Sequence, residues 1–411
     1  MRVCVIDPSL FTPAYDRHLC IGLAETGLQV ALCGRRLRAA EVNADEGYRF
    51  EPRCYPWTER GQAAGPTGAA AWLKAGEHAL RLPALGGWLR RNFDVLHFQW
   101  SPMPAVDRHL WRSLARDRAV VFTVHDTTPF LGRPTSRLQG LGWRSLLDIA
   151  HGLIVHTESS RRVLTDLGID PAKVHVVPHG PLSAGKPGVL PEPATPSASV
   201  PDGRRTILVF GEIKPYKGID VLLRAAARLP AGVAAGWKIV VAGRPRCEMD
   251  ELHALGRASP IPVEWKLGYI PDAEIAPLFR SADIVAFPYR QIDASGALML
   301  ALPFGVPVVA SRVGVFGELL QDGVTGLLAA PGDPDDLARV LARAMSDEGL
   351  RTSLRAQVLD RVRHVWSWQA IARAHEAIYR RYALQVGVVK PTAGPRETGV
   401  GREASAMTAG R

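Results

Sequence analysis

Short β-branched runs alternate along the chain with segments whose apolar residues recur every three or four positions. This alternation is typical of parallel strands covered by helices. The first unit predicts a strand at 3–6, a helix at about 12–26 and a strand at 30–33. Thr12 is placed to cap this helix and Gly27 to end it. Further strands are expected at 95–98, 119–124, 153–155 and 174–177.

The alternation stops after His179-Gly180, where Pro, Gly, Ser and Ala dominate. It restarts with strands expected at 206–210, 238–242, 263–266, 284–287 and 306–310. Because the intervening segment cannot bury enough apolar surface to fold, we interpret 181–204 as a linker. The pattern therefore predicts an α/β protein with two domains of similar size, at 1–180 and 205–365. Residues 386–411 lack periodicity and are predicted to be a disordered tail.

The composition excludes disordered and membrane-spanning classes of protein. A chain of 411 residues with 47% hydrophobic and 22% charged residues has an ordinary globular balance, which excludes wholesale disorder. No uncharged apolar stretch reaches the roughly 18 residues of a membrane span, and Asp7 interrupts any signal-peptide core. Five scattered cysteines without a CxxC pair favour buried thiols in a reducing cytoplasm. We therefore expect a cytoplasmic protein.

Two loops of the C-terminal half carry candidate phosphate chemistry. Ligands of open parallel sheets bind beyond the carboxyl ends of the strands. Gly211 ends one strand, and Lys214 and Lys217 precede the next helix, so backbone N–H groups and positive charge converge on a predicted diphosphate site. The residues Ser295-Gly296-Ala297 open another helix, where unpaired N–H groups suit a phosphate. Ser295 as an ordinary helix cap explains this second loop equally well.

In the N-terminal half, a strand ends in His125 and Asp126, a histidine beside a carboxylate that faces the predicted cleft. A hydrogen-bonded structural histidine is the alternative interpretation. His179 either reaches the same cleft or belongs to a hinge. Asp333-Pro334-Asp335 has the Asp-x-Asp spacing of some metal sites, but a capped helix with Pro at its first position explains it better. No metal site is predicted.

The order and spacing of these motifs resemble family four of the retaining glycosyltransferases, the "group 1" family with the GT-B fold. The resemblance covers residues 1–385. The motifs are Thr123-x-His125-Asp126, Val177-Pro178-His179-Gly180, Gly211 with Lys217-Gly218, Ser295-Gly296, Gly305-Val306-Pro307-Val308-Val309-Ala310-Ser311 with Gly314 and Glu318, and Asp322-Gly323-x-Thr325-Gly326-Leu327.

This resemblance implies two facing Rossmann-like domains, with a nucleotide sugar held mainly by the C-terminal one and an acceptor by the N-terminal one. A helix at 366–385 would cross back to the N-terminal domain. Lys217 would neutralise the donor diphosphate, the amides of 295–297 would hold its distal phosphate, and His125 would lie at the reacting sugar. Tyr269 and Ile270 would flank the nucleobase. Retention would proceed by front-face displacement, without a metal or another cofactor.

The chain also departs from the family pattern. Ile292 and Leu300 occupy the positions of the usual Glu-x7-Glu pair, so Glu318 or backbone groups would have to hold the ribose. Glu212 replaces an arginine, which leaves Lys214 as the nearby substitute for its charge. Pro13-Ala14 replaces the glycine pair before the first helix and removes one amide N–H. These departures motivate an alternative function, a non-catalytic GT-B scaffold.

The net charge of +10 points to anionic partners without choosing among them. Nucleic-acid binding lacks a recognition motif or an aromatic platform, and an NAD-dependent oxidoreductase would need a GxGxxG after a strand. Between residues 72 and 93, tryptophans and leucines interleave with Lys and Arg. A core-facing helix with a solvated basic side is the simpler interpretation, and contact with an anionic membrane is the alternative.

The expected activity follows from the resemblance. It is the transfer of a hexose-type sugar from a UDP or GDP sugar to a hydroxyl of a glycan or lipid-linked glycan, with retention of configuration. The expected setting is bacterial polysaccharide or glycoconjugate synthesis, in the cytoplasm or at the inner face of the plasma membrane.

Overall fold

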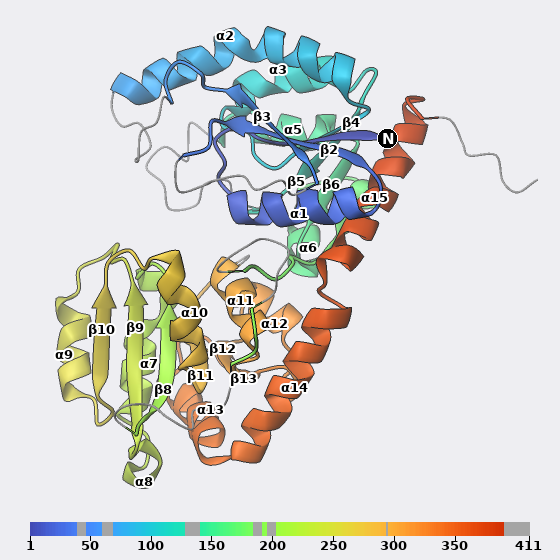
Figure 1. The fold of residues 1–411 in the computed structure, drawn as a ribbon. Coiled ribbons are helices and arrows are strands. Elements are labelled where there is room, and N and C mark those ends of the chain that lie inside the picture. Colours follow the sequence, from blue (N-terminus) through green and yellow to red (C-terminus); the bar gives the residue numbers. More distant parts are fainter. Residues whose placement is uncertain are drawn as a thin grey trace, which may run out of the picture.

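The computed structural model describes residues 1–38, 47–59, 69–127, 140–183, 191–194, 203–292 and 295–389. Residues 184–190 and 195–202 of the predicted linker, and the predicted tail beyond residue 389, lie outside the described residues. The chain forms two lobes, each built on its own parallel sheet, with the last two helices running along both (Figure 1). This is the predicted α/β architecture.

The N-terminal lobe contains seven parallel strands in the order β3-β2-β1-β4-β5-β6-β7. Its strands are β1 (Arg2–Asp7), β2 (Gln29–Arg35), β3 (Arg49–Cys54), β4 (Val95–Phe98), β5 (Ala119–Thr123), β6 (Gly152–Val155) and β7 (Val174–Val176). Its helices are α1 (Pro13–Glu25), α2 (Ala69–Asn92), α3 (Pro104–Leu114), α5 (Trp143–Ile149) and α6 (Glu158–Asp166). Apolar side chains pack on both faces of the sheet, which explains the uninterrupted apolar runs of its central strands.

The predicted cap of α1 is wrong in its detail. Thr12 is the N-cap residue, but its side chain accepts no hydrogen bond from the first turn. Its hydroxyl instead lies 3.4 Å from Oδ1 of Asp16 and accepts a 3.0 Å hydrogen bond from Nε1 of Trp100. Asp7, at the end of β1, accepts the backbone N–H of Thr12 at 3.0 Å. A buried carboxylate therefore organises the turn between β1 and α1.

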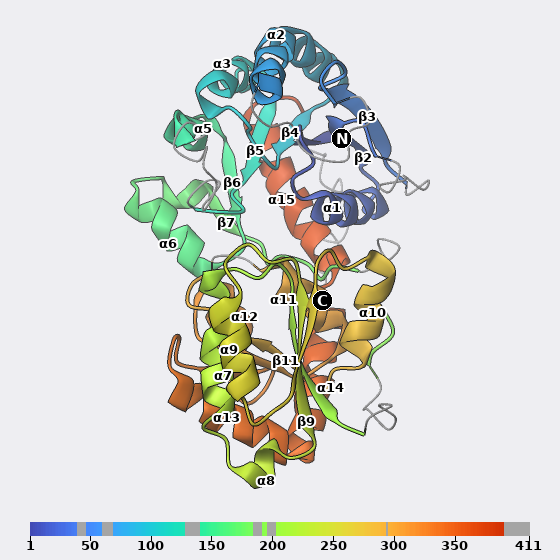
Figure 2. The ribbon, with the colours of Figure 1, turned by 90° about the vertical axis from the view of Figure 1, so that its left-hand side faces the viewer.

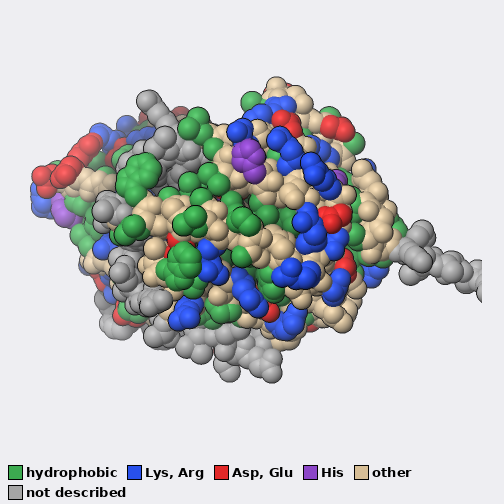
Figure 3. Space-filling model, turned by 90° about the horizontal axis from the view of Figure 1, so that it is seen from above, with side chains coloured by type: hydrophobic (Ala, Val, Ile, Leu, Met, Phe, Trp, Pro, Cys, Tyr) green, Lys and Arg blue, Asp and Glu red, His purple; other side chains and the backbone are tan. Residues whose placement is uncertain are grey.

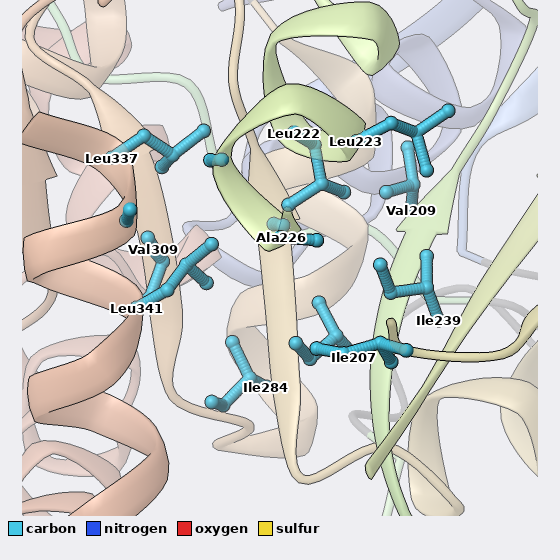
Figure 4. Packing of buried hydrophobic residues seen from close by; sticks show 14 of the residues in the cluster. Ile207, Val209, Leu222, Leu223, Ala226, Ile239, Ile284, Val309, Leu337 and Leu341 are labelled. Atoms are coloured by element: carbon cyan, nitrogen blue, oxygen red, sulfur yellow. The ribbon is translucent and has the colours of Figure 1, made fainter. Parts of the chain in front are cut away.

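The C-terminal lobe contains six parallel strands in the order β10-β9-β8-β11-β12-β13. They are β8 (Arg205–Phe210), β9 (Trp237–Gly243), β10 (Val263–Leu267), β11 (Ile284–Phe287), β12 (Val308–Ser311) and β13 (Leu327–Ala329). The helices are α7 (Ile219–Ala226), α8 (Ala231–Ala234), α9 (Asp250–Ala258), α10 (Asp272–Arg280), α11 (Gly296–Ala301), α12 (Gly314–Leu319) and α13 (Pro334–Ser346). Leu222 of α7 and Leu341 of α13 pack against Ile207 and Val309 of the sheet (Figure 4).

Two C-terminal helices join the lobes. After α14 (Glu348–His364), α15 (Trp368–Gln385) crosses back and packs against α1 and β5 of the N-terminal lobe (Figures 1 and 2). The indole of Trp368 donates to the carbonyl of Pro181 at 2.7 Å, which fixes the start of the helix to the connection between the lobes. The predicted crossover helix is thereby confirmed.

Candidate functional site

The loop after β8 brings three of the predicted site residues together. Gly211 has φ 107°, and a Cβ there would lie 2.8 Å from Nζ of Lys217 and 3.9 Å from Cβ of Ala297. At Gly218, φ is 65° and any Cβ would collide with the carbonyl oxygen of Pro288. Both positions therefore require glycine, because side chains would fill the space that the lysine and the neighbouring backbone occupy.

Lys217 is unusually enclosed for a lysine. Its side chain is only 7% exposed, and its ammonium lies 5.2 Å from the ring centre of Tyr289. Burial lowers the pKa of Lys217 to about 8, and the positive charge of Lys214 adds to this effect. A desolvated ammonium favours a bound anion, because the anion restores the electrostatic stabilisation that water no longer provides.

This loop is stabilised by an ion pair between Arg290 and Asp220, which the sequence did not predict. The guanidinium of Arg290, which follows β11, binds both carboxylate oxygens of Asp220 at 2.9 and 2.6 Å. It also donates to the carbonyl of Pro215 at 2.9 Å, and the backbone N–H of Arg290 donates to the carbonyl of Tyr216 at 2.8 Å. The loops after β8 and β11 are thus held as one unit. Arg290 and Asp220 meet because β8 and β11 are neighbours in the sheet. The sequence pattern did not specify that these strands are neighbours.

Lys214, which was expected to substitute for the charge of the missing arginine, shares Glu212 with a second cation. Glu212 lies 3.0 Å from Nζ of Lys214, but Arg246 contacts the same carboxylate at 2.8 Å through both Nε and a terminal nitrogen. Arg246 follows β9, the neighbouring strand. The carboxyl edge of the C-terminal sheet therefore has two cations, Lys214 and Arg246, around the carboxylate of Glu212. Lys217 adds a third positive charge.

Ser295 caps α11, as one of the two interpretations expected. Its hydroxyl accepts the backbone N–H of Leu298 at 3.2 Å. Gly296 and Ala297 form the first turn of the helix, next to Gly211. The predicted phosphate-binding residues Gly211, Lys217 and Ala297 therefore lie together, whereas the contact of a phosphate with Ser295 and Gly296 stays a prediction.

The two residues that replace the usual glutamates are apolar, and their surroundings are apolar too. Ile292 and Leu300 are partly buried and pack against the hydrophobic cluster beneath α11. Tyr269 and Ile270 follow β10. The side chain of Tyr269 is 75% exposed, whereas Ile270 packs against the same cluster as Ile292. A nucleobase contact of these two residues stays a prediction.

On the opposite lobe, His125 belongs to a buried cluster of aromatic rings. Its ring stacks on Trp100 at 5.3 Å and meets Tyr15 edge-on at 5.1 Å. Tyr15 also contacts the rings of His156 and His179 at 5.4 and 4.8 Å. Burial lowers the pKa of His125 well below its ordinary value and that of His179 to about 3. His179 thus joins His125 at the carboxyl edge of the N-terminal sheet.

Glu318 lies between the lobes. Its carboxylate accepts the backbone N–H groups of Glu158 and Ser159 at 2.6 and 2.8 Å, the first amides of α6, and Arg162 lies 3.9 Å away. Its predicted role in holding a ribose stays a prediction, since in this arrangement the carboxylate satisfies the start of an N-terminal-lobe helix.

Asp333 caps α13, accepting the amides of Asp335 and Asp336 at 2.9 and 3.1 Å, as the preferred interpretation expected. Within the described ranges of the chain, no cluster of three or more His, Cys, Asp or Glu is placed to hold a metal. None of the helices that the structure describes is both long and apolar enough to cross a membrane.

Comparison with known proteins assigns a family to each lobe. Residues 15–180 match the family described as Glycosyltransferase Family 4, and residues 204–347 match Glycosyl transferases group 1. The D-inositol 3-phosphate glycosyltransferases of Mycobacterium tuberculosis and Mycobacterium bovis are 31% identical over 304 residues, which are 67% of this chain. The chain spans 61% of the length of these curated relatives.

Solved structures share the fold of both lobes. Sucrose-phosphate synthase from Thermosynechococcus elongatus has a TM-score of 0.70 at 17% identity, covering 94% of this chain and 100% of that chain. Anabaena HepE in complex with UDP and glucose has a TM-score of 0.64 at 17% identity, covering 95% and 100%. These likenesses establish the GT-B arrangement of two Rossmann-like domains.

Proposed function

Because this chain belongs to the family-four, group 1 glycosyltransferases, we propose that it transfers a hexose-type sugar from a nucleoside-diphosphate donor to a hydroxyl acceptor, with retention of configuration. The observation that supports this proposal most directly is the convergence of Gly211, the enclosed Lys217 and Ala297 at one strand end. These residues offer a positive charge and close backbone approach to a diphosphate.

The proposed chemistry uses groups that the protein holds in place. Cleavage of the bond between sugar and diphosphate concentrates negative charge on the leaving oxygens. Lys217 stabilises that charge, and the Arg290–Asp220 pair keeps its loop in position. The leaving phosphate takes the proton of the attacking hydroxyl on the same face of the sugar, which retains the configuration. His125 lies at the carboxyl edge of the facing sheet, where the sugar would be.

The two lobes approach each other at these residues. Burial raises the pKa of Tyr216, next to Lys217, and the negative charge of Asp126, next to His125, contributes to this shift. Asp126 belongs to the N-terminal lobe and Tyr216 to the C-terminal lobe. This proximity supports placing the proposed donor site and the proposed sugar site on facing parts of the two lobes.

A thermal-shift panel with UDP, GDP and ADP and their sugar conjugates tests the donor, because a ligand that binds only the folded protein raises its melting temperature. We expect one nucleotide family to stabilise the protein, slow hydrolysis of the matching sugar donor, and loss of that hydrolysis by at least tenfold in Lys217→Ala. Lys266→Ala, an exposed lysine paired with Glu264 on the same lobe, is the control. Stabilisation by none of the nucleotides would support the non-catalytic scaffold instead.

We further propose that the acceptor is a glycan or a lipid-linked glycan at an anionic membrane, in bacterial glycoconjugate synthesis. The supporting surface is the first half of α2. Leu82 and Leu89 of this helix are buried, as the core-facing interpretation expected, but Trp72, Leu73 and Leu80 are 74%, 68% and 75% exposed. The core-facing interpretation is therefore wrong for the first turns of the helix.

Charge surrounds this apolar surface. Figure 3 looks onto the side of the N-terminal lobe that carries α2 and α3, where Lys and Arg side chains outnumber acidic ones and lie among hydrophobic side chains. Trp57, 54% exposed, lies beside it, with the guanidinium of Arg81 5.2 Å from its ring centre. Exposed tryptophan and leucine flanked by arginine suit the interface of an anionic bilayer.

Sedimentation with vesicles of phosphatidylcholine alone, or with added phosphatidylglycerol, tests this surface. We expect binding to the anionic vesicles at low salt, weakened at least fivefold in a Trp72→Ser, Leu73→Ser, Leu80→Ser variant. Val163→Ser and Leu167→Ser, also exposed but on α6 and at its end, form the matched control. Equal sedimentation of the wild type and the triple variant would remove this surface from the proposal.

A further inference from the structure

His125 and His156 form a buried pair of imidazoles with an acceptor at each end. Nδ1 of His125 lies 3.2 Å from Nε2 of His156. At one end, Nδ1 of His156 lies 3.0 Å from the carbonyl oxygen of Val177, and at the other, Nε2 of His125 lies 2.8 Å from Oε1 of Gln99. The four residues of this row follow different strands, so the row exists only in the folded lobe.

The contacts along this row need more hydrogens than two neutral imidazoles carry. A carbonyl oxygen only accepts, so Nδ1 of His156 must carry a hydrogen, and Nε2 of His125 must carry one if it donates to Oε1 of Gln99. The contact between the rings needs a further hydrogen. Three contacts therefore need three hydrogens, whereas two neutral imidazoles carry one each. The neutral pair is one proton short of satisfying the row as it stands.

Gln99 can resolve this shortage because its amide has an acceptor and a donor side. If the amide turns, its NH2 group donates to Nε2 of His125, and two hydrogens then satisfy all three contacts. The side chain of Gln99 is fully buried, so bulk water does not decide its orientation. Its amide nitrogen lies 3.4 Å from both ring nitrogens of His97, and turning the amide would bring its oxygen to that ring instead. The amide orientation and the proton count of the pair are thus coupled.

The groups that face the pair favour its neutral state in the absence of a ligand. Burial lowers the pKa of His156 to about 4, and neighbouring histidines add to the lowering for His125. The titratable groups around the pair are Tyr15 of α1, His97 at β4, His179 after β7 and His375 of α15, with Asp126 following His125. A third proton therefore requires additional negative charge nearby.

We propose that His125 and His156 take up one proton from solvent, shared between their rings, when an anionic nucleoside diphosphate enters the cleft, and that Gln99 is the positioning residue that accepts from the resulting His125 Nε2–H. This inference rests on the proposed function, because the diphosphate supplies the negative charge. The pair would then present a positive charge to the donor from the N-terminal lobe, opposite Lys217.

Calorimetry with UDP tests proton uptake directly. The binding enthalpy is measured at the same neutral pH in two buffers of different ionisation enthalpy, with GDP and ADP run in parallel. We expect uptake approaching one proton per bound nucleotide. Lys217→Arg is measured as well, because arginine stays protonated and removes any contribution from the lysine. Uptake that persists in this variant comes from another group, as the proposal requires.

Variants of the row separate the pair from other groups. Gln99→Leu and His156→Gln should each reduce proton uptake to near zero, and His109→Gln, an exposed histidine of α3, should leave it unchanged. In nitrogen-15 NMR of the free protein, Gln99→Glu should yield a doubly protonated histidine at neutral pH that the wild type lacks, because a carboxylate can only accept.

The outcomes distinguish the two proposals. Nucleotide binding without proton uptake, or uptake unchanged in Gln99→Leu and His156→Gln, would overturn the inference while leaving the glycosyltransferase function standing. Failure of every nucleotide to bind would count against the proposed function. The NMR comparison still decides the inference then, since a Gln99→Glu protein with only neutral imidazoles would refute the coupling between Gln99 and the pair.

Discussion

At the scale of single residues, the turn between β1 and α1 contains two buried carboxyl groups, Asp7 and Asp16. Burial raises the pKa of Asp16 well above its ordinary value, and the charge of Asp7 raises it further. Asp7 accepts the amide of Thr12, so Asp16 is the partner that carries a proton between the two. Folding therefore favours the protonated form of Asp16, and burying this carboxyl costs free energy at any pH where the unfolded chain would leave it ionised.

Replacing Asp16 by Asn should stabilise the protein at neutral pH. An amide at this position can donate to Asp7, and it needs no proton uptake. Since the folded pKa of Asp16 is raised, its favourable contribution is complete below the unfolded pKa and declines as pH rises toward the folded pKa. We expect Asp16→Asn to gain about 1 kcal/mol or more in the free energy of unfolding at neutral pH.

Urea unfolding at several pH values measures this effect. The difference between Asp16→Asn and the wild type should shrink as pH falls toward the ordinary carboxyl pKa of 3.8. Asp7→Ala is the contrasting variant, because it removes the acceptor for the Thr12 amide and should destabilise the protein. A pH-independent loss of stability in Asp16→Asn would show that the carboxyl is needed for another reason.

The sequence predicted individual site residues at strand ends, but it did not predict the residues that interact with them. His125 and Lys217 stand out because each lies at or after a strand that ends at the ligand-binding edge of a sheet. Arg246, Arg290 and Gln99 do not stand out, because their role comes from which strands are neighbours. The order of strands in space places Arg246 beside Glu212, and no local pattern records that order.

At the scale of elements, the central strands were predictable because burial on both faces makes them continuously apolar. The edge strand β3 escaped prediction, since its sequence RFEPRC contains a proline and three charged residues and its pattern is mostly exposed. The first half of α2 was misjudged for a related reason. Its tryptophan and leucines have the spacing of a buried face, but no element within the described part of the chain covers them.

Helix α15 stabilises the N-terminal lobe through one buried hydrogen bond in particular. The hydroxyl of Tyr379 lies 2.6 Å from Nδ1 of His97, and both side chains are fully buried. Tyr379→Phe should lower the free energy of unfolding by about 1–3 kcal/mol, because it removes the short hydrogen bond of a buried ring nitrogen and leaves only the 3.4 Å contact with Gln99. Tyr382→Phe is the matched control. Its hydroxyl bonds the half-buried His175 at 2.9 Å, so water can replace it at lower cost.

Chemical denaturation followed by tryptophan fluorescence compares the two variants. The larger loss should belong to Tyr379→Phe, with the slope of the transition unchanged, because only one buried contact is altered. Equal losses in both variants would mean that the difference in burial between the two contacts has no energetic consequence.

At the scale of the whole molecule, Glu318 is the group that ties the lobes through backbone amides. Its carboxylate accepts the N–H groups of Glu158 and Ser159, which α6 itself cannot satisfy. A carboxylate at a helix N-terminus also interacts favourably with the helix dipole. Together these contacts are worth about 1–2 kcal/mol toward the closed arrangement, enough to change the ratio of closed to open molecules roughly five- to thirtyfold.

Glu318→Ala should therefore shift the molecule toward a more open arrangement of its lobes. The expected results are a larger radius of gyration in small-angle X-ray scattering and faster hydrogen exchange at the amides of Glu158 and Ser159. Glu274→Ala, an exposed glutamate of α10 on the same lobe, is the control. Because the remaining amides of α6 are hydrogen-bonded within the helix, their exchange should change less, which separates loss of the contact from unfolding of the lobe. Unchanged exchange at both amides would show that Glu318 does not hold the lobes together in solution.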